Sequence, residues 1–110
     1  MLDEVSQRAV HEMRNEGVIW ILKDEDGCVM LSTDDEDGVP VWSNELQAKA
    51  WASEEWSHCE TLAIDTQTWL RKWTVGLMQD HLVVMINPSE LHEEGVVVSP
   101  EELAEALSKE

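Results

Sequence analysis

Hydrophobic residues in this chain fall into short runs whose spacing alternates between that of a strand and that of a helix. Three apolar runs lie within residues 17–42. They are separated by two acidic turns of identical sequence, Asp24-Glu25-Asp26-Gly27 and Asp35-Glu36-Asp37-Gly38. An Asp-Gly pair between apolar runs is a strong hairpin signal, because glycine takes positive φ at no steric cost. The pattern therefore predicts a three-stranded antiparallel meander with both glycines at positive φ.

The rest of the chain adds helices and further strands. Helical periodicity is predicted over residues 3–16, ending at Gly17, and from a cap at Ser43 or Asn44 to about residue 53. It is also predicted over residues 65–79, with a cap at Asp65, and from Pro100 onward, with a capping box formed by Ser99 and Glu102. Further strands are predicted at residues 58–64, 81–87 and 95–98. We therefore expect a single α+β domain over residues 1–110, with a mixed, partly antiparallel sheet of five or six strands and helices packed on it. Its βαβ steps should be right-handed if their strands are parallel.

Three positions carry more specific expectations. Residues 18–22 are apolar at every position, which predicts a strand covered on both faces. Pro40 lacks an N–H group, so its strand should be an edge strand, or Pro40 should lie near a strand end. Gly76 falls within the apolar stripe of the third helix, where it would permit close approach to the sheet.

The second helix has two apolar faces. Leu46 and Ala50 form one face, while Ala48, Trp51 and Ala52 form another, well apart from the first. A helix of this kind packs on two neighbours, or it leaves one face for a partner.

Charge narrows the function classes. The chain has 24 acidic and seven basic residues and a net charge of −17, yet 43% of its residues are hydrophobic, enough to build a core. Nucleic acids and anionic membrane surfaces are excluded as ligands because both require clustered cations, so a protein partner should be basic. The sequence opens without a signal-peptide pattern, and its longest apolar run is too short to span a bilayer, which predicts a cytoplasmic protein. A monomer and a weak dimer both remain open.

Motifs for catalysis or metal binding are not apparent. The acidic turns lack the register of an EF-hand loop, so they are interpreted as hairpin turns. His58 and Cys59 are adjacent candidate ligands, but neighbouring residues on a strand point to opposite faces, so one metal could not easily take both. Cys59 with His58 or His81 remains a weak nucleophile candidate, although a core cysteine is the simpler interpretation. The sequence predicts no catalytic residue, no cofactor and no metal.

Three of the six tryptophans lie on or beside the second helix, close in sequence to the acidic turns: Trp42, Trp51 and Trp56. Tryptophan surrounded by acidic residues suits an anchor-and-rim surface for a protein partner. The alternative is that Trp51 fills the core, as tryptophan in a small domain usually does.

Several motifs together resemble a small family of uncharacterised, acidic, single-domain bacterial proteins. They are a tryptophan-containing hairpin at residues 20–27, Pro40-Val41-Trp42, the Trp-Leu-x-x-Trp helix at residues 69–73, and the closing segment at residues 96–104. The Pro-Val-Trp segment leading into a helix is more distantly similar to the N-terminal part of SseB-like enhanced-serine-sensitivity proteins. The resemblance implies a domain of unknown function and transfers no functional residues.

The sequence thus favours a non-enzymatic cytosolic protein-interaction module, such as an adaptor or an inhibitor of a basic partner. The alternative is a small enzyme or ligand-binding domain with a pocket near Trp42, and a third hypothesis is an acidic decoy of nucleic acid. Exposure of Trp51 would favour the first hypothesis.

Overall fold

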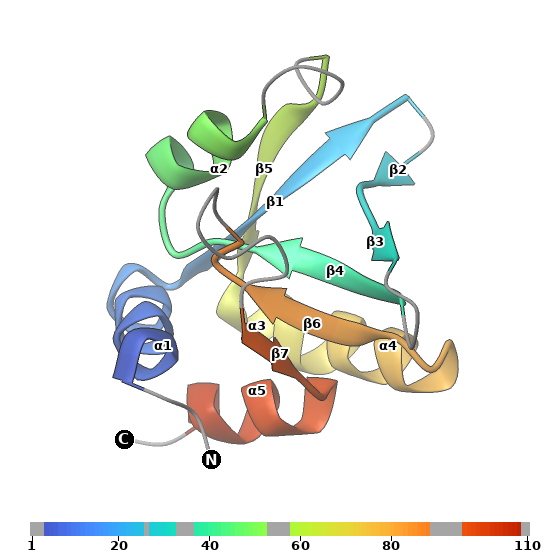
Figure 1. The fold of residues 1–110 in the computed structure, drawn as a ribbon. Helices are drawn as coiled ribbons and strands as arrows, with labels where there is room; N and C mark the ends of the chain where they lie inside the picture. Colours follow the sequence, from blue (N-terminus) through green and yellow to red (C-terminus); the bar gives the residue numbers. More distant parts are fainter. Residues whose placement is uncertain (1–3, 26, 33–36, 53–57, 89–95, 109–110) are drawn as a thin grey trace.

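The computed structural model describes residues 4–25, 27–32, 37–52, 58–88 and 96–108 (Figure 1). The helices are α1 (Glu4–Glu16), α2 (Glu45–Trp51), α3 (Thr66–Thr68), the π-helical turn η2 (Trp69–Trp73), α4 (Thr74–Gln79) and α5 (Pro100–Ser108). The strands are β1 (Val18–Asp24), β2 (Gly27–Cys28), β3 (Leu31–Ser32), β4 (Asp37–Val41), β5 (Glu60–Asp65), β6 (Val83–Ile86) and β7 (Val96–Val98). The α+β fold class is confirmed.

The strands lie in two sheets rather than in the single sheet expected from the sequence. One sheet has the order β2-β1-β5 and is antiparallel, and the other has the order β3-β4-β6-β7, with β4 and β6 parallel. An isolated bridge joins the sheets, in which the N–H groups of Trp20 and Trp42 each donate to the carbonyl oxygen of the other at 3.0 and 2.9 Å. Each helical connection leads from one sheet to the other, so the handedness rule for parallel strands of one sheet does not apply to it.

The predicted three-stranded meander is wrong in its middle strand. Both turns do connect antiparallel strands, with Asp24 opposite Gly27 and Ser32 opposite Asp37. Between them the chain bends at buried Val29, whose N–H donates to Leu22 O at 2.9 Å, so that β2 and β3 join different sheets. Strand β1 pairs with β5 along one edge and with β2 along the other, and further along that second edge Trp20 pairs with Trp42, where an unbroken middle strand of the meander would have paired.

Strand β1 separates two hydrophobic clusters, which confirms that it is covered on both faces. Ile19 and Ile21 belong to the larger cluster with side chains of α1, α4, α5, β4 and β6. Leu22 belongs to the smaller cluster with Val29, Trp42 and Ala48, against which Trp20 packs. Alternation of side chains along a strand places these two sets on opposite sides of β1. The smaller cluster underlies α2, which packs on β1 and β5 (Figure 1).

Most helix ends follow their sequence signals. Helix α1 ends at Gly17, which has φ +74° and donates its N–H to Met13 O at 2.8 Å. Helix α5 begins with a reciprocal capping box, in which Glu102 N donates to Ser99 Oγ at 3.1 Å and Ser99 N donates to Glu102 Oε1 at 3.3 Å. Asp65 caps α3 by accepting from Thr68 N at 2.7 Å.

The third predicted helix contains a feature that the periodicity did not reveal. Its middle turn is π-helical, and Thr74 donates both its N–H and its Oγ1 hydroxyl to Trp69 O. Gly76 has open space where a Cβ would stand, so the predicted close approach of the sheet to this glycine is wrong.

In β4, one of the two alternatives for Pro40 is confirmed, whereas the expectation for Gly38 is wrong. This strand lies between β3 and β6 and is therefore not an edge strand. Pro40 is near its end, however, beyond the residues that pair with β3, so the strand-end interpretation is confirmed. Gly38 does not have positive φ, and it pairs with both Leu31 and Val83. A Cβ at Gly38 would stand 2.8 Å from Val83 Cγ2, so this glycine serves close strand packing instead.

Candidate functional site

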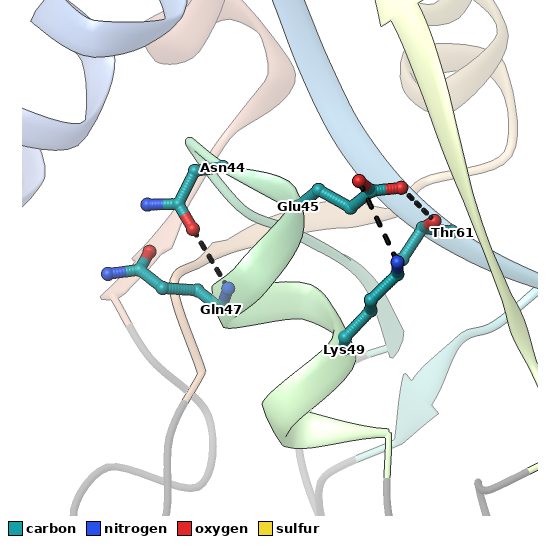
Figure 2. Close-up of polar contacts among 5 residues, drawn as sticks. All are labelled: Asn44, Glu45, Gln47, Lys49 and Thr61. Atoms are coloured by element: carbon teal, nitrogen blue, oxygen red, sulfur yellow. Dashed lines mark hydrogen bonds and ion pairs between the residues drawn. The ribbon is translucent and has the colours of Figure 1, made fainter.

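Helix α2 is the element around which the candidate site is built. Asn44 caps it by accepting from Gln47 N at 2.8 Å, and Glu45 and Lys49 form an i,i+4 ion pair at 3.8 Å. Thr61 on β5 donates its hydroxyl to the second oxygen of Glu45 at 2.8 Å, which joins helix and strand (Figure 2). The first turn of α2 is therefore fixed to β5 by side-chain contacts.

The two apolar faces of α2 have different environments. Ala48 is fully buried, and Trp51 and Ala52 are partly buried against the smaller cluster. The other face is open to solvent, with Ala50 exposed and Leu46 79% exposed. The next most exposed large hydrophobic side chains of the described residues reach only 50%. The prediction of two apolar faces is confirmed, and the outer one has no neighbour within the described part of the chain.

The predicted tryptophan surface divides into a buried and a half-buried residue. Trp42 is 1% exposed and donates its indole N–H to Pro88 O at 3.1 Å. Trp51 is half-buried, and its ring centroid lies 5.4 Å from that of Trp42 at an interplanar angle of 48°. Trp56 lies outside the described residues. A partner on α2 would therefore meet Trp51, which rests on Trp42, rather than Trp42 itself, and a partner-binding role for these residues stays a prediction.

A shallow depression lies where α2 meets β5. Its volume is about 430 Å³, and its lining residues are Lys49, Ala52, Cys59, Glu60 and Thr61. Ala52 and Cys59 also pack against the cluster that contains Trp42, so the depression lies beside the position where the sequence suggested a pocket.

One group of polar side chains was not expected to meet. Asp24, His58 and Cys59 each place one oxygen, nitrogen or sulfur atom within 4.8 Å of the others. His58 Nε2 lies 4.0 Å from Asp24 Oδ2 and 3.9 Å from Cys59 Sγ. The sequence-based objection to this pair was wrong because β5 begins at Glu60. His58 lies in the preceding turn, where strand alternation does not govern its direction.

The register of the sheet brings Asp24 into this group. Lys23 pairs with Glu60, so Asp24 and Cys59 are the next residues along the two antiparallel strands. Cross-strand neighbours project from the same face of a sheet, and this face is the one that α2 covers. No local signal in the sequence indicates that Asp24 belongs to this group, because the pairing of β1 with β5 joins residues far apart in the chain.

The electrostatics and geometry of this group do not suit a nucleophilic cysteine. Burial, and then the nearby charge of Asp24, raise the pKa of the Cys59 thiol above its ordinary value. Both Asp24 and Cys59 approach the same ring nitrogen of His58. A catalytic relay requires the two partners to contact different ring nitrogens, so the arrangement is a cluster of potential ligands.

The fold and the site thus define a small acidic α+β domain with an exposed apolar helix face and a nearby group of possible metal ligands. The chain belongs to the family described as "Protein of unknown function (DUF2750)", whose model matches residues 6–107. This agrees with the resemblance to an uncharacterised family. No curated protein and no solved structure matches the chain. Within the described residues, no helix has the length and apolarity needed to cross a lipid bilayer.

Proposed function

We propose that this protein is a non-enzymatic, cytoplasmic protein-interaction module that binds a basic partner through the outer face of α2. The observation that carries the proposal is the 79% exposure of Leu46, beside exposed Ala50, on a helix whose opposite face is packed. An adaptor and an inhibitor are both consistent with such a surface. The distant similarity to SseB-like proteins stays a sequence-based expectation, and the proposal does not depend on it.

The construction of α2 supports this role. Interfaces depend on a few apolar anchors held on a rigid element and surrounded by polar residues. Here the anchor is Leu46, and the helix that presents it is fixed by the Asn44 cap and by the contact between Glu45 and Thr61. On the opposite face of the helix, the half-buried ring of Trp51 rests on Trp42 and helps to hold α2 on the smaller cluster. A partner could bind this face without rearranging the core.

Charge gives the expected chemistry of the partner. At a net charge of −17, the domain attracts a cationic protein and repels anionic surfaces. Long-range attraction of this kind mainly raises the association rate and is weakened by salt. We therefore expect the partner to carry an apolar side chain that contacts Leu46 within a basic surrounding.

Leu46 variants test the proposal with a matched control. Wild-type protein, Leu46→Glu and Val75→Glu are immobilised and used to capture binding proteins from cell extract, and each captured protein is identified, purified and titrated. Val75 is a suitable control because it is 50% exposed on α4, at the other end of the molecule from α2 (Figure 1). Both substitutions add the same negative charge on an exposed helix surface.

We expect Leu46→Glu to weaken the purified partner's affinity at least tenfold, or about 1.4 kcal/mol, slightly less than the roughly 1.5–3 kcal/mol gained by fully burying a leucine side chain. Val75→Glu should leave the affinity within twofold of wild type, and 0.5 M NaCl should slow association. A partner bound equally well by both variants would refute the role of α2. A small substrate turned over by the purified protein would refute the non-enzymatic assignment and favour the depression beside Cys59.

A further inference from the structure

The group formed by Asp24, His58 and Cys59 combines three different types of metal ligand. A carboxylate, an imidazole and a thiol are the side chains that bind Zn²⁺ in proteins, and here one atom of each lies within 4.8 Å of the others. From this juxtaposition we propose that the chain holds a binding site for a divalent transition-metal ion of the zinc class. The site lies at the open end of the β1–β5 pair.

The distances are close to those that coordination requires. In a tetrahedral zinc site with ordinary bond lengths, a nitrogen and an oxygen ligand are about 3.4 Å apart, and a nitrogen and a sulfur ligand about 3.6 Å. The corresponding distances here are 4.0 Å from His58 Nε2 to Asp24 Oδ2 and 3.9 Å from His58 Nε2 to Cys59 Sγ. The Asp24 oxygen and the Cys59 sulfur lie within 4.8 Å of each other, against about 3.6 Å in a tetrahedral site, so the ligand pairs need to approach by about 0.3 to 1.2 Å. The side chain of His58 is 61% exposed and can move toward the other two ligands, and the approach of Asp24 to Cys59 requires rotation of their own side chains.

The backbone holds the other two ligands in place. Asp24 ends β1, and Cys59 directly precedes β5, next to the paired residues Lys23 and Glu60. Cys59 packs against the smaller hydrophobic cluster, and Asp24 is only 28% exposed at its side chain. The site is thus supported on one side by the core and open on the other.

Ligand type also selects the metal. Thiolate and imidazole ligands favour zinc and related ions, whereas Mg²⁺ and Ca²⁺ prefer oxygen ligands alone. Three protein ligands leave a fourth tetrahedral position for a solvent molecule. The thiol proton of Cys59 passes to solvent when the metal binds, because the thiolate is the coordinating form.

Cobalt titration tests the site directly, because Co²⁺ occupies zinc sites and reports a bound thiolate by a charge-transfer band. Reduced wild-type protein is titrated with CoCl₂, and then with ZnCl₂ in competition, alongside Asp24→Asn, His58→Ala and Cys59→Ser. The matched controls are His11→Ala and Cys28→Ser. His11 is an exposed histidine on α1, and Cys28 is the other of the chain's two cysteines. Far-ultraviolet circular dichroism and thermal melting establish that each variant is folded.

We expect one equivalent of Co²⁺ to give the thiolate band and one equivalent of Zn²⁺ to displace it. Cys59→Ser should abolish the band, and His58→Ala and Asp24→Asn should each weaken binding at least tenfold. His11→Ala, Cys28→Ser and millimolar Mg²⁺ should leave the titration unchanged. The proposal fails if wild type shows no band, if the band survives in Cys59→Ser, or if Asp24→Asn and His58→Ala bind Co²⁺ as wild type does.

Discussion

Gly38→Ala tests how closely β4 and β6 pack. Although Gly38 follows an aspartate in a hairpin turn, it does not have positive φ in the folded chain. A Cβ there would lie 2.8 Å from Val83 Cγ2, 2.9 Å from Met85 Cε and 3.1 Å from Val83 O. The two side-chain atoms can move aside, but the carbonyl belongs to the backbone of β6, so the substitution must push the two strands apart.

The expected magnitude follows from the energetics of overpacking. Adding a methyl group to a closely packed site costs about 1–3 kcal/mol. For a domain of this size, each kcal/mol lowers the melting temperature by about 4 °C. We therefore expect Gly38→Ala to melt about 4–12 °C below wild type, with the free energy measured by urea denaturation at unchanged m-value.

A double-mutant cycle with Val83→Ala identifies the cause of the loss. Removing Val83 Cγ2 eliminates the shortest of the three contacts. The cost of Gly38→Ala should therefore be smaller by at least 0.5 kcal/mol in the Val83→Ala background. An equal cost in both backgrounds would contradict the packing explanation.

Substituting asparagine for Gly38 distinguishes two reasons why a glycine is needed there, close packing and an unusual backbone conformation. Asparagine tolerates left-handed backbone conformations better than alanine does, so a glycine required for positive φ would be replaced better by asparagine. If space is limiting at Gly38, Gly38→Asn should instead be less stable than Gly38→Ala. The opposite order would refute the reasoning from the close contacts. Gly17 offers the comparison, because it has φ +74° and nothing lies within 4 Å of its Cβ position.

Three further predictions concern Trp51, Asp65 and net charge. Trp51 is half-buried against Trp42. Trp51→Ala should therefore lower the free energy of unfolding, measured by urea denaturation, by about 2 kcal/mol, which is less than the roughly 3–5 kcal/mol typical of a fully buried tryptophan. A loss of about 4 kcal/mol or more would show that Trp51 is a core residue. Hydrogen bonds from Thr68 hold the folded-state pKa of Asp65 below its ordinary value. The stabilisation from this carboxylate is therefore present above the ordinary pKa and is lost as pH falls through the folded-state pKa. Melting curves between pH 5 and pH 2 should therefore show a smaller acid-induced loss for Asp65→Asn, which keeps a capping side chain, and an equal loss would contradict this. With a net charge of −17, the melting temperature should rise from low salt to 0.5 M NaCl, where the Debye length is about 4 Å; a flat or falling response would mean that the acidic charges are locally compensated.

Local signals in the sequence predicted the elements well. The caps at Asn44 and Asp65, the capping box at Ser99 and the glycine stop at Gly17 are all present, because each depends on residues within one turn of one another. The double cover of β1 was also predictable, since residues 18–22 are apolar on both faces. What local patterns could not determine was how the strands divide between two sheets.

Long-range pairing accounts for the expectations that failed. Gly38 has the sequence of a turn glycine, yet its role is set by β6, more than forty residues away. In the same way, Asp24 meets Cys59 only because β1 pairs with β5. The sequence predicted that α2 has two apolar faces, but it did not show which of them is exposed. Only the packed structure shows that Leu46 is on the outside.

Site-specific photo-crosslinking in living cells tests the proposed interaction most directly. A photoreactive phenylalanine derivative is placed at position 46, and in a second variant at position 75 as the control. If α2 binds a partner through its outer face, illumination should give a discrete adduct from position 46, and the adduct from position 75 should be absent or much weaker. Equal adducts from both positions, or none from position 46 in a folded variant, would contradict the proposed role of α2.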